Sequence, residues 1–360
     1  NTRRSGYNIK KFVSNYFSST NFPNDDTSGV EKKDTWVSVS GLKEDGSMYA
    51  GSAAQRNIVV SAMKAAVDSN TDVLDANYNF NLLVAPGYPE LIPNLVTLND
   101  NRSDTGFVIG DTPMTLSPNA TDITAWNSNA NGDGLATSSP YLAVYYPAGL
   151  TNDLAGNTVA VPASHAALHT FLYNDNVSYP WFAPAGVHRG LVSNLSDIGY
   201  VDAQTGSFVH NGVNQALRDT LYTLNINPIA QLPGTGLVVW GQETRSGDST
   251  ARNRVNVVRL ENYLRVIFAS VSNAYLFEQN DTITRAQFIS TVTPFLRDVQ
   301  GRRGIIDFRV KCDESNNTGE VIDRNEFIAD IFIKPNRSIN FITLNFVAAR
   351  SAISFNEIGA

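Results

Sequence analysis

Residues 236–260, GLVVWGQETRSGDSTARNRVNVVRL, decide the fold of the C-terminal part of this chain. The apolar run 236–240 predicts a strand, and the polar run that follows predicts a turn. A helix is expected to begin near Asn253, because apolar residues from there on recur at helical spacing. They form one stripe: Val255, Val258, Tyr263, Val266, Ile267 and Val271. The stretch therefore predicts a strand, a turn and a helix with one buried face.

A second helix and three strands are predicted after this unit. The helix opens at 281–284, where a threonine can cap it, and Pro294 predicts a kink or a restart. Apolar alternation predicts strands at 304–312, 325–333 and 339–347. Residues 236–360 are therefore expected to form an α+β domain, in which a small mixed or antiparallel sheet carries two helices.

Upstream, short apolar runs that end at proline or glycine alternate with helical patterns. Strands are predicted at 80–85, 105–110 and 141–146, and helices at 53–69, 89–101, 118–130 and 162–173. This alternation is typical of a parallel α/β sheet covered on both faces. The fold class is therefore multi-domain: an outer α/β domain at 51–235 precedes the smaller α+β domain. Residues 1–50 are interpreted as an irregular connecting segment with one strand at 36–40.

Composition excludes several classes of protein. The chain has 360 residues and a net charge of −7, and its acidic excess lies in residues 1–235, which disfavours direct nucleic-acid binding. Residues 236–360 are nearly balanced, with 15 basic and 14 acidic residues. No apolar run is long enough to predict membrane insertion. Cys312 is the single cysteine, which excludes internal disulfides, and its place in an apolar alternation predicts a small buried side chain.

Six short blocks of the C-terminal part carry a family resemblance. They are PGTG at 233–236, VWGQETR at 239–245, RVNVVRL at 254–260, FEQND at 277–281, KCD with NN at 311–317, and KP at 334–335 before INFI. In this order they resemble the C-terminal core of contractile tail sheath proteins of myovirus-type bacteriophages. WFAPAG at 181–186 and LNINP at 224–228 extend the resemblance over 179–360. Sheath chains usually carry an N-terminal extension, and this sequence opens at Asn1, so an upstream segment is expected to be missing.

The resemblance implies a structural role. Copies would polymerise as rings or a helix around a tail tube protein, with baseplate and tail terminator proteins as further partners, and would contract to drive the tube through the host envelope. Such a subunit needs no cofactor; it would belong to the tail sheath of the virion and be assembled in the host cytoplasm. An alternative is the sheath of a related contractile injection machine, of the type VI secretion or tailocin kind.

An α/β hydrolase is the alternative from a different class. Ser164 and His165 lie next to each other, with His169 and Asp175 nearby, but no Gly-x-Ser-x-Gly turn places a nucleophile. Adjacent residues on a helix also point to different sides. The four histidines lack the spacing of a metal site, and no phosphate-binding glycine motif is present. The sequence therefore favours a protein with no catalytic site and no metal site.

Two sets of residues are candidates for contacts in an assembly. In sheath proteins the C-terminal domain lies innermost, so a basic surface is expected to face an acidic tube; its candidates are Arg252, Arg254, Arg259, Arg265, Arg297, Arg302 and Arg303. Pairing of Arg259 or Arg265 with Glu261 or Glu278 inside the domain is the alternative. Sheath proteins also exchange terminal strands. Residues 351–358 alternate and are the candidate strand, through Ile353, Phe355 and Ile358.

Overall fold

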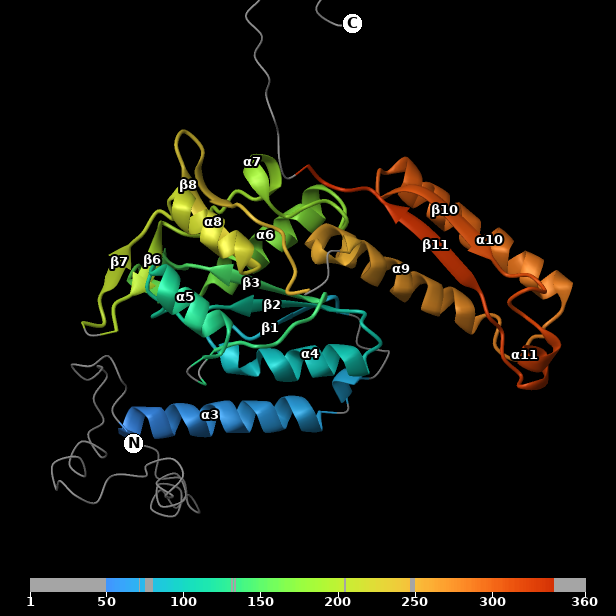
Figure 1. Ribbon diagram of the computed structural model, residues 1–360, viewed down its shortest axis with the longest axis horizontal. Coiled ribbons are helices and arrows are strands. Elements are labelled where there is room, and N and C mark those ends of the chain that lie inside the picture. Colours follow the sequence, from blue (N-terminus) through green and yellow to red (C-terminus); the bar gives the residue numbers. More distant parts are fainter. Residues whose placement is uncertain are drawn as a thin grey trace, which may run out of the picture.

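The computed structural model describes residues 50–70, 72–74, 80–130, 132, 134–203, 205–246 and 250–339. A five-stranded sheet forms its centre, in the order β1-β2-β3-β8-β9 (Figure 1). The strands are β1 (Leu82–Val84), β2 (Phe107–Asp111), β3 (Leu142–Tyr146), β8 (Ile226–Leu232) and β9 (Gly236–Val239). The first four run parallel, and β9 runs antiparallel to β8. Every residue of β2 and β3 is buried, as expected for central strands covered on both faces.

Helices cover both faces of this sheet. They are α4 (Ile92–Asn101), α5 (Ala120–Asn127), α6 (Ala163–Val177), α7 (Gly186–Arg189) and α8 (Gln215–Thr223), with the 3-10 turn η2 (Pro89–Leu91) before α4. Helix α3 (Ala50–Ser69), followed by the 3-10 turn η1 (Asp72–Leu74), packs on the outer side of α4 (Figure 1). Phe107 of β2 stacks on Phe171 of α6, whereas a side chain at Gly110 would meet Ile92 of α4. Positions 107 and 110 point to opposite faces of a strand. Helices α6 and α4 therefore lie on opposite faces of the sheet.

A second sheet was not predicted from the sequence. It has four antiparallel strands in the order β5-β4-β6-β7, formed by β4 (Ala148–Asn152), β5 (Thr158–Val161), β6 (Asp197–Val201) and β7 (Phe208–His210). Strand β4 follows β3 almost directly, so the chain passes from the central sheet into this one without a helix. The residues predicted to form one parallel α/β sheet thus also contain an antiparallel sheet.

The C-terminal unit is built on two helices and a hairpin. After the turn η3 (Ala251–Asn253), it contains α9 (Val255–Asn273), α10 (Thr282–Gly301), β10 (Ile305–Lys311), α11 (Gly319–Asp323) and β11 (Asp330–Pro335). Strands β10 and β11 pair antiparallel. Helix α10 continues through Pro294, so the predicted restart is absent, and its N-cap is the Asp281 side chain, which accepts from the Thr284 amide. The strand predicted at 36–40 and all but the first residue of the one predicted at 339–347 lie outside the described residues.

The division between the two hydrophobic cores lies closer to the C-terminus than the domain boundary expected at residue 236. Strand β9 pairs with β8 and belongs to the central sheet. Val255 and Val258 of α9 lie in the main core, whereas Leu260 and Leu264 lie in the core of the C-terminal unit. The division between the two cores therefore runs through the first turns of α9, which leaves the central body in Figure 1 to join the C-terminal unit.

A segment from the middle of the chain enters the C-terminal core. Trp181 is buried there and stacks on Tyr179, with ring centroids 4.8 Å apart. Its indole Nε1 donates to the carbonyl of Arg302 at 3.1 Å. Trp181 is therefore a buried hydrophobic anchor that connects residues lying far apart in sequence.

Asp111 joins three elements at the end of β2. Its carboxylate accepts from the backbone amides of Gly87 and Ser164 and from the Ser164 hydroxyl, 2.8 Å away. Ser164 lies in the first turn of α6, so the carboxylate binds free helical amides there. Burial raises the pKa of Asp111 to about 6, against the opposing effect of these hydrogen bonds.

We expect Asp111 to make stability depend on pH. Its folded pKa lies above its unfolded value of 3.8, so this contribution is fully present below that value and is lost as pH rises through 6. The difference in unfolding free energy between wild type and Asp111→Asn should therefore fall by about 2 kcal/mol from pH 4 to pH 7 in denaturant titrations. Asp153→Asn is the control: hydrogen bonds from Asn157 lower the pKa of this exposed carboxylate, which predicts the opposite slope. Parallel profiles for wild type and Asp111→Asn would contradict the prediction.

Candidate assembly surface

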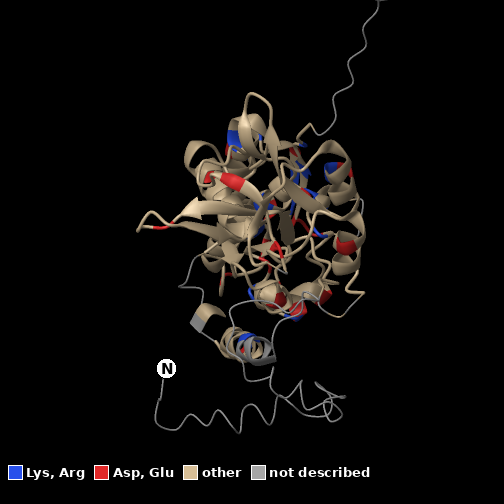
Figure 2. Ribbon diagram, turned by 90° about the vertical axis from the view of Figure 1, so that its left-hand side faces the viewer, with Lys and Arg blue, Asp and Glu red and all other residues tan. Residues whose placement is uncertain are grey.

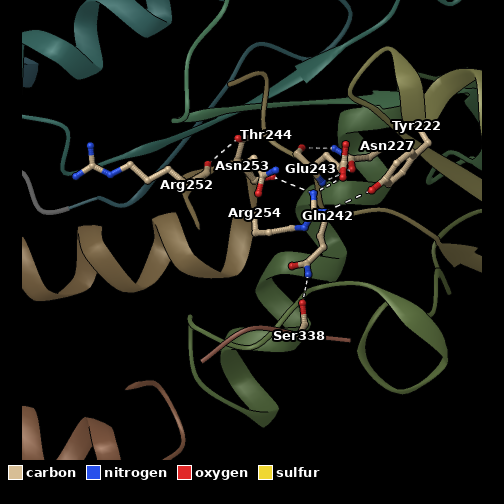
Figure 3. A network of polar contacts seen from close by, with 9 residues as sticks. All are labelled: Tyr222, Asn227, Gln242, Glu243, Thr244, Arg252, Asn253, Arg254 and Ser338. Atoms are coloured by element: carbon tan, nitrogen blue, oxygen red, sulfur yellow. Dashed lines mark hydrogen bonds and ion pairs between the residues drawn. The ribbon is translucent and has the colours of Figure 1, made fainter. Parts of the chain in front are cut away.

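Residues 240–246 carry the chain from the central sheet toward α9 and are held mainly by polar contacts (Figure 3). The Asn227 side chain makes two hydrogen bonds to the backbone of Glu243: its oxygen accepts from the amide at 2.6 Å, and its nitrogen donates to the carbonyl at 2.8 Å. The Thr244 hydroxyl donates to the carbonyl of Arg252 at 2.8 Å. These contacts fix the path of the backbone between the two cores.

Arg245 is buried in this segment with uncharged partners. Its guanidinium donates to the Asn127 side chain and to the carbonyls of Leu135, Thr137 and Leu224. Burial lowers the pKa of Arg245, because the charged form loses hydration. The side chain therefore fastens the loop after α5 to the central sheet, a role that the sequence did not indicate.

The C-terminal end of the described chain returns to the same segment. The Gln242 side-chain amide contacts the Ser338 hydroxyl. Asn336 donates its backbone amide to the carbonyl of Gly304 at 3.0 Å and its side-chain amide to the carbonyl of Arg303 at 3.2 Å. Residues 336–339 therefore run from the end of β11 toward α7 (Figure 1).

Arg259, one of the predicted contact arginines, lies inside the subunit. Its side chain is 2% exposed and makes two hydrogen bonds to Asp175 of α6, at 2.8 and 2.6 Å. The guanidinium also lies 5.0 Å from the centre of the Phe171 ring. The internal partner is Asp175, not the Glu261 or Glu278 considered from the sequence. Because it is buried, Arg259 has no surface with which to meet a tube.

Three further arginines form ion pairs within the subunit, and the exposure of these pairs differs. Arg252 pairs with Glu261 at 2.9 Å, Arg265 pairs with Asp104 at 3.1 Å, and Arg254 pairs with Glu243. The Arg254 pair is largely buried, whereas the Arg252 side chain is 48% exposed. Arg254 also donates to the Tyr222 hydroxyl at 3.4 Å (Figure 3). These pairs leave less free positive charge along α9 than the sequence suggests.

The remaining candidates lie at the far end of α10. Arg297 and Arg303 are exposed. Arg302 bonds to Asp298 and to the Tyr179 hydroxyl, both at 2.9 Å, but its side chain stays 46% exposed. Basic and acidic positions are interspersed along the ribbon in Figure 2. The end of α10, rather than the whole length of α9, is therefore the exposed basic region among the seven candidates.

An apolar groove lies beside the hairpin of the C-terminal unit. Its volume is about 1280 Å³, and it runs between α9 and the β11 side of the hairpin. Its apolar lining includes Leu264, Phe268, Tyr275, Phe327, Ile331 and Ile333. Within the described ranges, β10 and β11 pair only with each other, so the outer edge of β11 lacks a neighbouring strand. The groove combines an apolar floor with free backbone groups at its side.

The residues of the hydrolase alternative do not come together. The Ser164 hydroxyl is buried and donates to Asp111, whereas His165 is exposed. Asp175 forms an ion pair with Arg259. Among the described residues, no group of three or more His, Cys, Asp or Glu is arranged to hold a metal ion. None of the described helices has the length and apolar character needed to cross a bilayer.

Sequence comparison shows which proteins the C-terminal part is similar to. Residues 248–349 match the family described as phage tail sheath C-terminal domain. The tail sheath protein of Vibrio phage KVP40 is 44% identical over 186 residues, and that of Enterobacteria phage T4 is 40% identical over 184 residues. These matches cover 52% and 51% of this chain and 26% of each relative, so they span about a quarter of the relatives' length. The resemblance inferred from the short blocks is confirmed.

Structural comparison extends the likeness over most of the chain. The sheath complex of an extracellular contractile injection system, PVC, in its contracted state matches with a TM-score of 0.62 and 23% identity, over 79% of this chain and 75% of that one. The helical sheath of the anti-feeding prophage in its contracted state matches with a TM-score of 0.59 and 19% identity, over 79% and 76%. At these identities the likeness establishes the fold, which in this chain mixes helices with parallel and antiparallel sheets.

The buried position of Arg259 gives a stability prediction. Arg259→Gln leaves the Asp175 carboxylate without its cation, and we expect the free energy of unfolding to fall by about 2–4 kcal/mol. Arg259→Lys should restore only part of this loss, because an ammonium group does not form the two-pronged contact. Arg297→Gln is the exposed control and should change stability by less than about 0.5 kcal/mol. Urea titration measures all three; equal midpoints for Arg259→Gln and Arg297→Gln would show that the pair is dispensable.

Proposed function

We propose that this chain is a structural subunit of a contractile bacteriophage tail sheath, which polymerises around the tail tube and contracts to drive the tube through the host envelope. The main support for this proposal is the open groove beside the unpaired edge of β11, inside the region that matches the tail sheath C-terminal domain. An apolar groove next to free backbone donors and acceptors is suited to receive a strand. The role is structural and uses no catalytic residue.

The dimensions of the C-terminal unit support strand addition. Two neighbouring helices of about 10 Å diameter can be covered by about four strands at a spacing of about 4.8 Å. The described hairpin supplies β10 and β11 only, and α10 packs mainly against β10. The uncovered part lies over α9, where Leu264 and Phe268 line the groove. Leu264 is already buried, and an added strand would also bury the partly exposed Phe268 and complete the sheet.

The donor in this proposal is the C-terminal tail of a neighbouring copy. Residues 336–339 leave the end of β11: Asn336 still bonds to Gly304 and Arg303 of the C-terminal unit, and Ser338 contacts Gln242 next to the central sheet. The tail beyond them contains the alternating segment 351–358, with Ile353, Phe355 and Ile358 as the candidate contact residues. Main-chain pairing tolerates bending at the connection, so linked subunits could slide past one another without separating.

Removal of the tail tests this link. We expect the full chain to form hollow polymers in negative-stain electron microscopy, and deletion of residues 350–360 to abolish or shorten them while the circular dichroism and unfolding midpoint stay unchanged. Phe355→Asp should act in the same way, because it places a charge on the apolar face of the strand. Asn356→Asp, on the opposite face, is the matched control. Sheaths of normal length from Phe355→Asp would refute the role of this strand.

The tube-facing part of the proposal rests on the exposed basic end of α10. Arg297 and Arg303 are free to meet an acidic tube surface, and Arg302 presents part of its guanidinium there. Single exposed pairs contribute little, but an array repeated around the tube would set the register between the two polymers. Sheath copies, the tube, the baseplate and the tail terminator are the expected partners, in a virion tail assembled in the host cytoplasm.

Charge reversal tests the tube contact. Arg297→Glu combined with Arg303→Glu should prevent co-sedimentation with isolated tubes and leave the fold intact, since both residues are exposed. The control is Arg324→Glu, which changes an exposed arginine elsewhere in the unit, paired with Glu326. If the double variant bound tubes as the wild type does, Arg297 and Arg303 would not contribute to the contact with the tube.

A related contractile injection machine is the second candidate. It is favoured by the fold likeness to the PVC and anti-feeding prophage sheaths, which covers more of the chain than the matches to phage relatives. Both candidates use the same subunit mechanics, in which new contacts in the contracted array supply the free energy. Particles that carry a DNA-filled capsid above the sheath would identify the phage, and headless particles would identify the injection machine.

A further inference from the structure

A second cavity lies where the described chain ends. It has a volume of about 510 Å³ and is walled by α8, β8, the segment around Trp240 and the last described residues, Ser338 and Ile339. Three of its lining side chains are apolar yet exposed: Trp240 by 45%, Tyr222 by 40% and Ile339 by 80%. Exposed aromatic side chains around one cavity indicate that something covers them.

One buried polar group at this cavity also lacks a complete set of partners. Gln242 is 6% exposed and lines the cavity; its amide nitrogen contacts the Ser338 hydroxyl, and its oxygen has no hydrogen-bond partner. A hydroxyl can donate or accept, so reversing the amide would leave the nitrogen unpaired instead. In either orientation one polar atom of a buried amide remains open, at a cost that a peptide group could remove.

We propose that this cavity binds residues 340–342 of the same chain, with the Phe341 side chain between Trp240 and Tyr222. The chain continues for 21 residues beyond Ile339, which already forms part of the wall. Phe341 is three residues past Ser338, and extended chain advances about 3.3 Å per residue, so its ring can reach across the cavity. The backbone at Asn340 offers both a donor and an acceptor to Gln242.

This anchor fixes the point from which the C-terminal tail leaves the subunit. Residues 343–350 then form a connection of up to about 28 Å when extended. If the proposed strand exchange holds, that connection sets how far the neighbouring β11 edge can lie. The anchor itself is a property of the single subunit, so it stands or fails independently of assembly.

Disulfide trapping tests the anchor in monomeric full-length protein. Asp219→Cys with Asn340→Cys, in a Cys312→Ala background, leaves Trp240, Tyr222 and Phe341 in place and should form an intramolecular disulfide under mild oxidation, detected by peptide mapping and mass spectrometry, because Asp219 lines the cavity. Tyr173→Cys with Asn340→Cys is the matched control, because Tyr173 is 43% exposed and does not line the cavity. A disulfide yield no higher than the control, or a disulfide formed only between two copies, would overturn the proposal.

A second measurement does not depend on new cysteines. Phe341→Ser should uncover Trp240, with a red shift of its fluorescence and loss of protection from acrylamide. Trp126 and Trp181 are both buried, and the Trp240→Phe variant identifies any contribution from other tryptophans. Fluorescence and quenching unchanged by Phe341→Ser would show that Phe341 does not cover Trp240 and would overturn the proposal.

Discussion

Helix α9 has to bury side chains in two hydrophobic cores, and the arrangement of the subunit depends on this constraint. Val255 and Val258 pack in the main core, and Leu260 and Leu264 pack in the core of the C-terminal unit. A helix is stiff over this length, so its direction sets the orientation of the C-terminal unit. The Arg259–Asp175 pair holds α9 against α6 at the point where the two cores meet.

Stiffness inside the subunit contrasts with the open edge of its C-terminal sheet. The inner face of the hairpin packs on α10, but the groove along α9 is left with apolar walls and an unpaired strand edge. Soluble proteins usually protect such edges. A subunit that moves as a rigid body and is linked to its neighbours by added strands would combine the two properties, because the links can bend while each body keeps its shape.

Polar contacts, rather than apolar ones, guide the chain between the two cores. Asn227, Gln242 and Thr244 bond mainly to backbone groups or to Ser338, and Arg245 is satisfied by carbonyls and one amide side chain. Hydrogen bonds of this kind are directional, so they favour one backbone path where apolar packing would accept several. The same contacts bring Ser338, and with it the start of the C-terminal tail, beside Trp240.

The sequence by itself determined the local elements: helical periodicity placed α3, α6, α9 and α10, and apolar alternation placed β10. The short blocks showed the resemblance of the C-terminal part to tail sheath proteins. Only the tertiary structure decided what these elements do. It assigned β9 to the central sheet, formed the antiparallel sheet of β4–β7, and paired Arg259 with a carboxylate 84 residues away. Periodicity reports which face of an element is buried, because it depends on neighbours along the chain. The residue that packs against that face depends on the path of the whole backbone. Only the tertiary structure could therefore show which of the candidate arginines are buried, which are paired and which are exposed.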